Sequence, residues 1–172
     1  MGKLDRYSCQ SIDDADINSV VGVLRSDFLT QGPMVSEFEA SMTDITKAAF
    51  ACAVSSATAA LHIGLAGLGV KKGDHVWTTP NTFVATVNAA CYCEASVSLI
   101  DIDQETYNLD LSALERKLAT TANPTLLPKV VIPVHFGGNP VDSARLSSLA
   151  TKYGFKILED ASHALGSANT KE

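Results

Sequence analysis

The sequence has few cysteines and lacks any long apolar run. Its four cysteines, Cys9, Cys52, Cys91 and Cys93, form no CxxC pair, so neither a zinc knuckle nor a disulfide framework is indicated. No apolar stretch reaches the length of a membrane span, and the opening residues MGKLDRYSCQ lack the apolar core of a signal peptide. We therefore expect a cytoplasmic protein with reduced cysteines and no membrane partner.

An excess of basic residues is also missing. The chain has 13 Lys and Arg against 19 Asp and Glu, which gives a net charge of -6. This balance argues against nucleic acid as a partner, because non-specific binding needs a basic surface. A small anionic ligand is still compatible, since backbone amides at a helix N-terminus bind phosphate. The glycine cluster GLAGLGVKKG follows a helical segment rather than a strand, which disfavours a GxGxxG dinucleotide site.

The first 48 residues are predicted to be helical. A helix over residues 11–26 begins at Ser11, with acids in its first turn and apolar residues at helical spacing. Gly32 and Pro33 interrupt the pattern. A second helix is predicted over residues 34–47.

From residue 49 the pattern changes to short apolar runs that alternate with helical segments. The predicted strands cover 49–54, 75–79, 96–102, 129–134 and 155–160, and the predicted helices cover 55–69, 82–93, 110–120 and 142–154. This alternation predicts right-handed βαβ crossovers. The expected fold is α/β, a mainly parallel sheet with helices on both faces. We expect one domain over residues 1–172, which joins the helical segment 1–48 to the βα repeats of 49–172.

Two strand ends carry residues suited to a flat, phosphorylated ligand, which in such sheets binds beyond the carboxyl ends of the strands. SSAT, residues 55–58, opens a helix whose free N–H groups suit a phosphate, although an ordinary Ser N-cap is the alternative. Phe83 follows the next strand, where its ring can stack on a flat ligand. A buried core phenylalanine is the alternative there.

Asp160 follows the last predicted strand. A carboxylate at the end of a strand buried on both faces needs a hydrogen-bond donor or a cation, such as a protonated ring nitrogen. Capping of the following turn, DASH, is the alternative. His163 either contacts the same ligand or completes the turn. Together, a phosphate site, a stacking ring and a carboxylate match pyridoxal 5'-phosphate, whose protonated pyridine ring acts as an electron sink.

Six motifs resemble, in order, the N-terminal half of the DegT/DnrJ/EryC1/StrS aminotransferases. They are FLTQGPMVSEFE, AVSSATAALHIGL, KKGDHVWTTPNTFVATVNA, DIDQETYNLD, IPVHFGGNPVD and ILEDASHALGS. The resemblance implies a truncated large domain of the aspartate-aminotransferase-like fold (fold type I). It also implies a pyridoxal-phosphate enzyme that aminates nucleotide-linked keto sugars for surface polysaccharides and glycans. PVHFGG and EDASHALG are most similar to the enzymes that make 4-amino-4,6-dideoxy sugars, such as pseudaminic acid precursors.

The resemblance assigns five cofactor contacts. Asp160 matches the partner of the pyridine nitrogen, and His163 matches the residue near the phenolic oxygen of the cofactor. Phe83 matches the ring that stacks on the cofactor, and Ala57 and Thr58 match the residues that contact its phosphate.

Further residues and partners are implied by the same resemblance. Thr30 and Gly32, in FLTQGP, match a substrate-binding loop at the mouth of the site. The Schiff-base lysine, which follows the aspartate motif in the family, has no match in this sequence, so no catalytic residue and no metal ligand are assigned. Family members form dimers, so we expect a homodimer or other self-association.

Two functional hypotheses stay open. The chain is either a fragment of a sugar aminotransferase, inactive alone or completed by a second chain, or a non-enzymatic remnant. Such a remnant would bind pyridoxal phosphate or a nucleotide sugar, or would pair with a full-length homologue.

Overall fold

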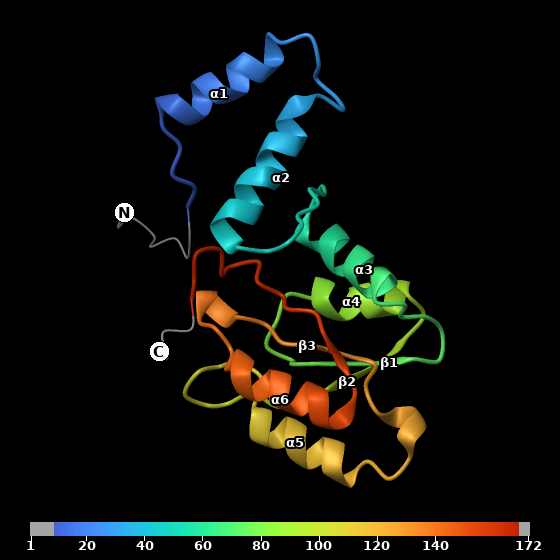
Figure 1. The fold of residues 1–172 in the computed structure, drawn as a ribbon. Coiled ribbons are helices and arrows are strands. Elements are labelled where there is room, and N and C mark those ends of the chain that lie inside the picture. Colours follow the sequence, from blue (N-terminus) through green and yellow to red (C-terminus); the bar gives the residue numbers. More distant parts are fainter. Residues whose placement is uncertain (1–8, 169–172) are drawn as a thin grey trace, which may run out of the picture. The chain divides into compact units, whose positions relative to one another are not determined.

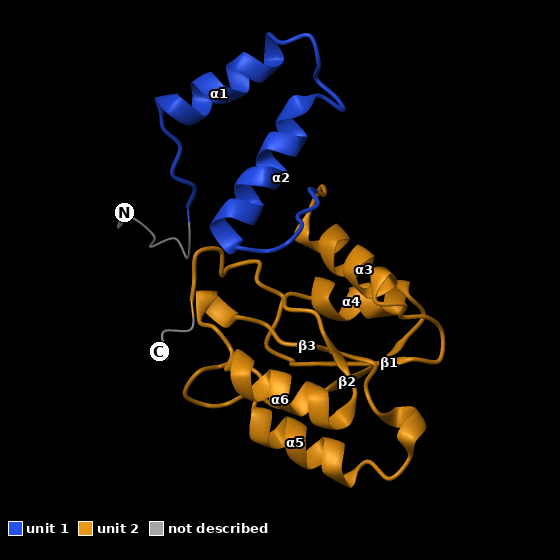
Figure 2. Ribbon diagram, viewed as in Figure 1, with its two compact units in different colours: residues 1–53 blue, residues 54–172 orange. Residues whose placement is uncertain are grey.

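The chain contains two compact units. The structure is a computed structural model that describes residues 9–168 (Figure 1). The units comprise residues 1–53 and residues 54–172 (Figure 2). The first unit contains helices α1 (Asp14–Leu24) and α2 (Pro33–Thr46), and the second contains a sheet with its covering helices.

Helix α1 begins at Asp14 rather than near the predicted Ser11, because Asp13 caps it. The Asp13 carboxylate accepts hydrogen bonds from the backbone N–H groups of Ala15 (2.8 Å) and Asp16 (3.1 Å). The Asp16 carboxylate in turn accepts one from the Asp13 N–H (3.0 Å). This reciprocal capping box satisfies donors for which the first helical turn has no acceptor.

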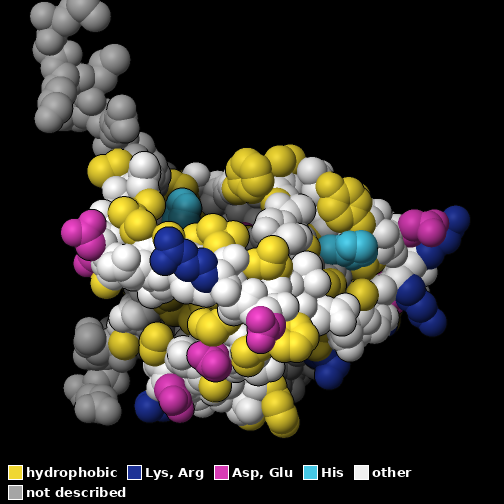
Figure 3. Space-filling view, turned by 90° about the horizontal axis from the view of Figure 1, so that it is seen from above, with side chains coloured by type: hydrophobic (Ala, Val, Ile, Leu, Met, Phe, Trp, Pro, Cys, Tyr) yellow, Lys and Arg dark blue, Asp and Glu magenta, His cyan; other side chains and the backbone are white. Residues whose placement is uncertain are grey.

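The apolar side chains of the first unit are exposed. None of its described residues is buried, and the exposed fraction of its large apolar side chains reaches 91% at Phe50. Many apolar side chains, yellow in Figure 3, are visible at the surface in that view. Helices of 11 and 14 residues depend on packing for most of their stability. The two helices of this unit therefore have no buried core of their own.

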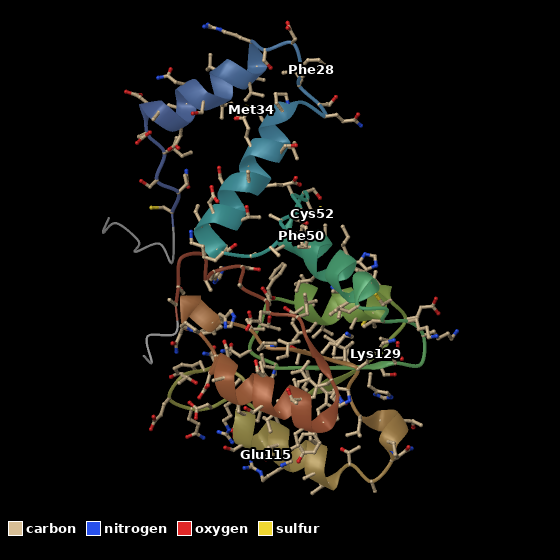
Figure 4. All side chains as sticks on the ribbon, viewed as in Figure 1. Phe28, Met34, Phe50, Cys52, Glu115 and Lys129 are labelled. Atoms are coloured by element: carbon tan, nitrogen blue, oxygen red, sulfur yellow. The ribbon has the colours of Figure 1, made fainter. Side chains whose placement is uncertain are left out.

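Helix α2 follows a close turn at its N-cap, Gly32. A Cβ atom on Gly32 would lie 2.8 Å from the Cβ of Phe28, so the approach of these two residues requires glycine. Pro33 occupies the first helical position, where its missing N–H costs no hydrogen bond. Figure 4 shows Phe28 in the segment between the helices and Met34 in the first turn of α2.

The second unit is built on a four-stranded parallel sheet with the strand order β2-β1-β3-β4. Its strands are β1 (His75–Thr78), β2 (Ser96–Leu99), β3 (Val130–Ile132) and β4 (Lys156–Ile157). Its helices are α3 (Ala57–Gly67), α4 (Ala85–Tyr92), α5 (Leu111–Thr120) and α6 (Ser143–Tyr153), with short 3-10 turns η1 (Pro124–Leu126) and η2 (Phe136–Gly138). The predicted α/β fold with a parallel sheet is confirmed.

Helices cover both faces of this sheet (Figure 1). One buried cluster joins α3 and α4 to the sheet through Leu65, Val76 and Ile132. The other joins α5 and α6 to the opposite face through Trp77 and Val131. Neighbouring strand residues thus enter different clusters, since side chains alternate across a strand. This explains why β3, whose three residues are all buried, is a continuous apolar run, whereas β2 at the edge of the sheet (SVSL) alternates.

The predicted strand over residues 49–54 is wrong. The segment is irregular, and none of the four strands pairs with it. Phe50, labelled with Cys52 in Figure 4, is 91% exposed. The Ala53 N–H donates to the Glu39 carboxylate at 2.8 Å instead of to a neighbouring strand. An apolar run becomes a strand only where a partner strand accepts its hydrogen bonds, and here the sheet supplies none.

No helix within residues 9–168 combines the length and the apolar character needed to cross a membrane. The four cysteines are free. Across the same described residues, His, Cys, Asp and Glu form no group suited to a metal ion.

Lys129, just before β3, stabilises the turn that precedes β1 (Figure 4). Its Nζ donates hydrogen bonds to the backbone oxygen of Gly69 and, at 2.8 Å, to the Asp74 carboxylate. The hydrogen bond from Lys129 is the main reason that the pKa of Asp74 lies below its ordinary value of 3.8. One ammonium therefore connects the end of α3 to the start of β1.

Lys129→Met should lower the free energy of unfolding at pH 7 by about 1–2 kcal/mol, because two hydrogen bonds are lost while the apolar stem is kept. Urea denaturation should show a lower midpoint at an unchanged m value. Since the folded-state pKa of Asp74 is lowered, its contribution is present above pH 3.8 and is lost as the pH falls through the lowered pKa. The difference between the two proteins should therefore shrink in acid.

Lys72→Met is the matched control. Lys72 pairs with Glu94 at 3.4 Å, but the two side chains are 83% and 69% exposed. Such a surface pair contributes little, so this variant should stay within about 0.5 kcal/mol of the wild type. Equal losses in the two variants would contradict the role assigned to Lys129.

Candidate functional site

A pocket of about 220 Å³ lies beyond the carboxyl ends of β1, β3 and β4, where ligands bind in open parallel sheets. It contains side chains from the start of α3 and from the segments that follow these strands. Its lining residues are Ala57, Thr58, Leu61, Thr82, Phe83, Ala85, Val134, His135, Phe136, Asp160, Ser162 and His163. All of them belong to the second unit.

Asp160 provides the buried carboxylate of this pocket and is only 7% exposed. One carboxylate oxygen accepts the hydroxyl of Thr86 at 2.7 Å. The other accepts the hydroxyl (2.6 Å) and the backbone N–H (3.3 Å) of Ser162. A carboxylate offers roughly four acceptor positions, so about one stays available to a ligand donor. The turn-capping alternative is therefore also realised, through Ser162, and it does not exhaust the carboxylate.

Thr86 is a site residue that the sequence analysis missed. It is 1% exposed and has a single hydroxyl proton, which it donates to Asp160. The Thr82 hydroxyl, 2.7 Å from that of Thr86, must then act as the donor between the two. The sequence feature that could have predicted this pair is the spacing of four residues between Thr82 and Thr86, which places both side chains on one side of a helix start.

The N-terminus of α3 forms another wall of the pocket. The Ser56 hydroxyl accepts the N–H of Ala59 at 3.2 Å, so the alternative of an ordinary Ser N-cap is realised. Ala57 and Thr58 are the first two helical residues, and their N–H groups have no acceptor within the helix. The positive end of the helix dipole adds to these donors, so this wall suits an anion such as phosphate.

Phe83 and His163 complete the predicted set of cofactor residues. Phe83 is 76% exposed and lines the pocket, so the alternative of a buried core phenylalanine is wrong. His163 is exposed and lies on the same pocket wall as Asp160. The five residues predicted to contact a cofactor are thus brought together around one pocket, and their role in binding stays a prediction.

Thr30 and Gly32 belong to the first unit. They lie in the segment between α1 and α2, where Thr30 is exposed and Gly32 is the N-cap of α2. The close contact with Phe28 requires a glycine at position 32 whether or not this residue binds a substrate. The role of both residues in substrate binding stays a prediction.

Glu159 and Asp160 point to opposite faces of the sheet, as neighbouring residues of an extended chain do. Asp160 meets Thr86 of α4, whereas Glu159 interacts with Ser143, the first residue of α6, and with His135. The His135 imidazole is the main cause that holds the pKa of Glu159 below its ordinary value. The carboxylate of Glu159 is therefore charged near neutral pH.

The η2 turn brings a glycine close to the segment after β4. Gly138 has a φ of +84°, and a Cβ there would lie 2.8 Å from the backbone oxygen of His163. The Ser167 hydroxyl donates to the Gly138 oxygen at 2.8 Å. The glycine is required both by its left-handed conformation and by this close approach. The turn thus fixes the position of the backbone that carries His163.

Comparisons with known proteins show the family of the chain. Residues 10–172 match the DegT/DnrJ/EryC1/StrS aminotransferase family. The chain is 42% identical, over 94% of its length, to the UDP-4-amino-4,6-dideoxy-N-acetyl-beta-L-altrosamine transaminase of Campylobacter jejuni, strain 81-176. It spans 42% of the length of that relative.

Solved structures give the same picture. The structure of 3-amino-5-hydroxybenzoic acid synthase matches with a TM-score of 0.82 at 32% identity, over 94% of this chain and 42% of that one. NtdA from Bacillus subtilis, solved with bound cofactor PMP, matches with a TM-score of 0.79 at 31% identity, over 87% of this chain and 33% of that one. The chain therefore corresponds to less than half of each of these proteins.

Thr86→Val should lower the free energy of unfolding by about 1–2 kcal/mol, because it removes a donor from the buried Asp160 carboxylate at nearly constant side-chain shape. Thr82→Val is the matched control, since it removes a hydroxyl but leaves the Thr86–Asp160 hydrogen bond in place. Its cost should be below about 1 kcal/mol. Urea denaturation at pH 7 measures the free energy of unfolding of both variants. An equal loss in both would show that the Thr86–Asp160 hydrogen bond contributes no more to stability than the Thr82–Thr86 hydrogen bond.

Proposed function

Because the chain belongs to the DegT/DnrJ/EryC1/StrS aminotransferase family, we propose that it supplies the cofactor-binding part of a sugar aminotransferase. The family uses pyridoxal 5'-phosphate, and the proposed substrate is a nucleotide-linked keto sugar used for surface polysaccharides and glycans. The observation that carries this proposal is the buried carboxylate of Asp160, which lines a pocket and keeps an acceptor position available.

The residues present fit the cofactor. Asp160 would accept a hydrogen bond from the N–H of the protonated pyridine ring. The first-turn N–H groups of Ala57 and Thr58 would donate hydrogen bonds to the phosphate. Phe83 offers an accessible ring face for stacking, and His163 would approach the phenolic oxygen. When bound, the cofactor supplies an electron sink that stabilises a carbanion during amino transfer. The part of this chain is to bind and orient the ring and to keep its nitrogen protonated.

The lining of the pocket contains no lysine. The lysines of residues 9–168 lie outside this lining, Lys156 on β4 included. Lys129 is engaged with Asp74, and Lys117 lies over the Trp77 ring. A lysine amine is the nucleophile that enzymes of this type use. We therefore propose that the described residues bind the cofactor without a covalent link, and that the chain alone has no aminotransferase turnover.

The relatives support the proposed substrate class. The Campylobacter relative is named as a transaminase of a UDP-linked amino sugar. We propose a substrate of the same kind, with Thr30 and Gly32 in its binding loop. The two units would then form one partial domain of the aminotransferase fold.

A non-enzymatic role is the second candidate, and the absence of lysine from the described pocket lining favours it. In that role the chain would bind pyridoxal phosphate or a nucleotide sugar, or would pair with a second chain that completes the site. Both candidates need the same pocket, so binding of the cofactor is the property to measure first.

Asp160→Asn should weaken binding of pyridoxal phosphate at least about tenfold, since the amide cannot stabilise a protonated ring nitrogen as a carboxylate does. A titration followed by visible absorbance measures the affinity of the wild type and the variant. Reduction with borohydride, followed by peptide mapping, should find no single lysine labelled in proportion to bound cofactor.

Glu105→Gln, which changes an exposed carboxylate in a turn, is the control and should bind like the wild type. If Asp160→Asn also binds like the wild type, the pocket is not a cofactor site. Labelling of one defined lysine would overturn the proposed lack of a covalent link.

We also propose that the chain self-associates through the outer side of α3 and α4. Ile63 and Tyr92 are each 56% exposed there, and the rings of His62 and Tyr92 lie 5.4 Å apart, which joins the two helices into one surface. Exposed apolar side chains of neighbouring helices favour association with a second copy.

Sedimentation velocity should show a dimer for the wild type at micromolar concentration, and Ile63→Lys should shift it toward the monomer, because a charge enters the apolar contact. Leu126→Lys is the control, since Leu126 is 46% exposed on η1. A monomeric wild type would refute the dimer, and equal effects of both variants would refute this surface.

A further inference from the structure

We propose that His135 is a positioning residue, which acts through Glu159 to fix the backbone that presents the Asp160 carboxylate to the pocket. The contribution to cofactor binding rests on the function proposed above, whereas the positioning itself does not. The proposal stands on the tautomer of His135, on its two contacts with the end of β4, and on the alternation of side chains along that segment. The two contacts are a backbone hydrogen bond to Asp160 and a 3.8 Å approach of Nε2 to the Glu159 carboxylate.

The first observation is that His135 is held in one orientation. Its side chain is 8% exposed, and its Nδ1 accepts the backbone N–H of Val141 at 3.1 Å. A nitrogen that accepts a hydrogen bond carries no proton, so in the neutral ring the proton lies on Nε2. Nε2 lies 3.8 Å from a carboxylate oxygen of Glu159. The ring thus joins the segment before α6 to the end of β4.

The second observation concerns the backbone contacts that hold the end of β4. The strand proper comprises Lys156–Ile157, and Asp160 meets the end of β3 only through an isolated bridge to Val134. In that bridge the Asp160 N–H donates to the Pro133 oxygen at 2.9 Å, and the His135 N–H donates to the Asp160 oxygen at 3.1 Å. Backbone and side chain of His135 therefore act on two consecutive residues, Asp160 and Glu159.

The third observation is geometric. Because side chains of an extended segment alternate, holding Glu159 on the α6 side directs Asp160 to the α4 side, where the pocket lies. Glu159 also interacts with Ser143 at the start of α6, and its lowered pKa keeps it charged at neutral pH. Loss of this attachment would let the segment rotate and would withdraw the Asp160 carboxylate from its place.

The turn around His135 has an independent anchor, so the ring can be replaced without loss of the turn. The Phe136 N–H donates to the side-chain oxygen of Asn108 at 2.9 Å, and the Asn108 amide donates to the Asn139 oxygen at 3.0 Å. Variants at His135 are therefore expected to fold. Their effect should concentrate on the segment 158–160.

The test compares three variants in the full chain. His135→Asn keeps an acceptor near Nδ1 but loses the donor toward Glu159, whereas His135→Gln keeps a donor near Nε2. Glu159→Gln removes the charge on the other partner. Glu115→Gln is the control, because Glu115 on α5 (Figure 4) pairs only with the exposed side chains of Lys152 and Arg145 among the described residues.

The first readout is amide hydrogen exchange by NMR, which needs no cofactor. His135→Asn and Glu159→Gln should each speed exchange of the Asp160 amide by about tenfold or more, with the core amides of β1 unchanged. His135→Gln and Glu115→Gln should stay close to the wild type. The proposal is overturned if the Asp160 amide exchanges at the wild-type rate in Glu159→Gln, or if His135→Gln is impaired as much as His135→Asn.

The second readout is the affinity for pyridoxal phosphate. His135→Asn and Glu159→Gln should weaken it by about three- to tenfold, less than Asp160→Asn. A wild type whose binding does not depend on Asp160 would refute the proposed function, while hydrogen exchange still decides the positioning. If Asp160 matters for binding but the two positioning variants bind like the wild type, this inference fails and the proposed function stands.

Discussion

Burying the Asp160 carboxylate at the end of a parallel strand costs free energy that only donors or a cation can offset. The surrounding structure provides three donor contacts, one from Thr86 of α4 and two from Ser162 in the turn after β4. The end of β3 fixes the backbone of the same residue on both sides. The site therefore depends on the meeting of α4, β3 and β4 at one edge of the sheet, and the acceptor position left on Asp160 is what makes the pocket suited to a cationic ring.

The different roles of the adjacent residues Glu159 and Asp160 follow from the same geometry. Asp160 faces the layer of α3 and α4, where the pocket lies, and Glu159 faces the layer of α6. Because the sheet separates these layers, one acid can bind a ligand while the other holds the segment in place. A strand that ended in a single acid would lack this second point of attachment. The pair Glu159–Asp160 is thus a structural unit rather than two independent charges.

Much of the fold could be predicted, because the burial of strands on both faces requires continuous apolar runs with helical segments between them. The predicted helices over residues 110–120 and 142–154 both begin with an aspartate, and in the structure Asp110 and Asp142 are the N-caps of α5 and α6. The run of residues 49–54 is apolar throughout, as strand β3 is, and is nevertheless irregular. Local pattern cannot distinguish the two cases, since the difference lies in whether a neighbouring strand is present.

The sequence by itself determined the α/β alternation, the family, and five of the residues that line the pocket, because these depend on short motifs at the ends of strands. Only the tertiary structure decided which groups share the buried carboxylate. Thr86 and Asp160 are 74 residues apart in the chain, and no local pattern records their hydrogen bond. The 3.8 Å approach of His135 Nε2 to the Glu159 carboxylate likewise joins residues that are distant in the chain. Hydrogen bonds between distant residues form where layers of the fold meet, and that meeting is a property of the packed sheet and helices.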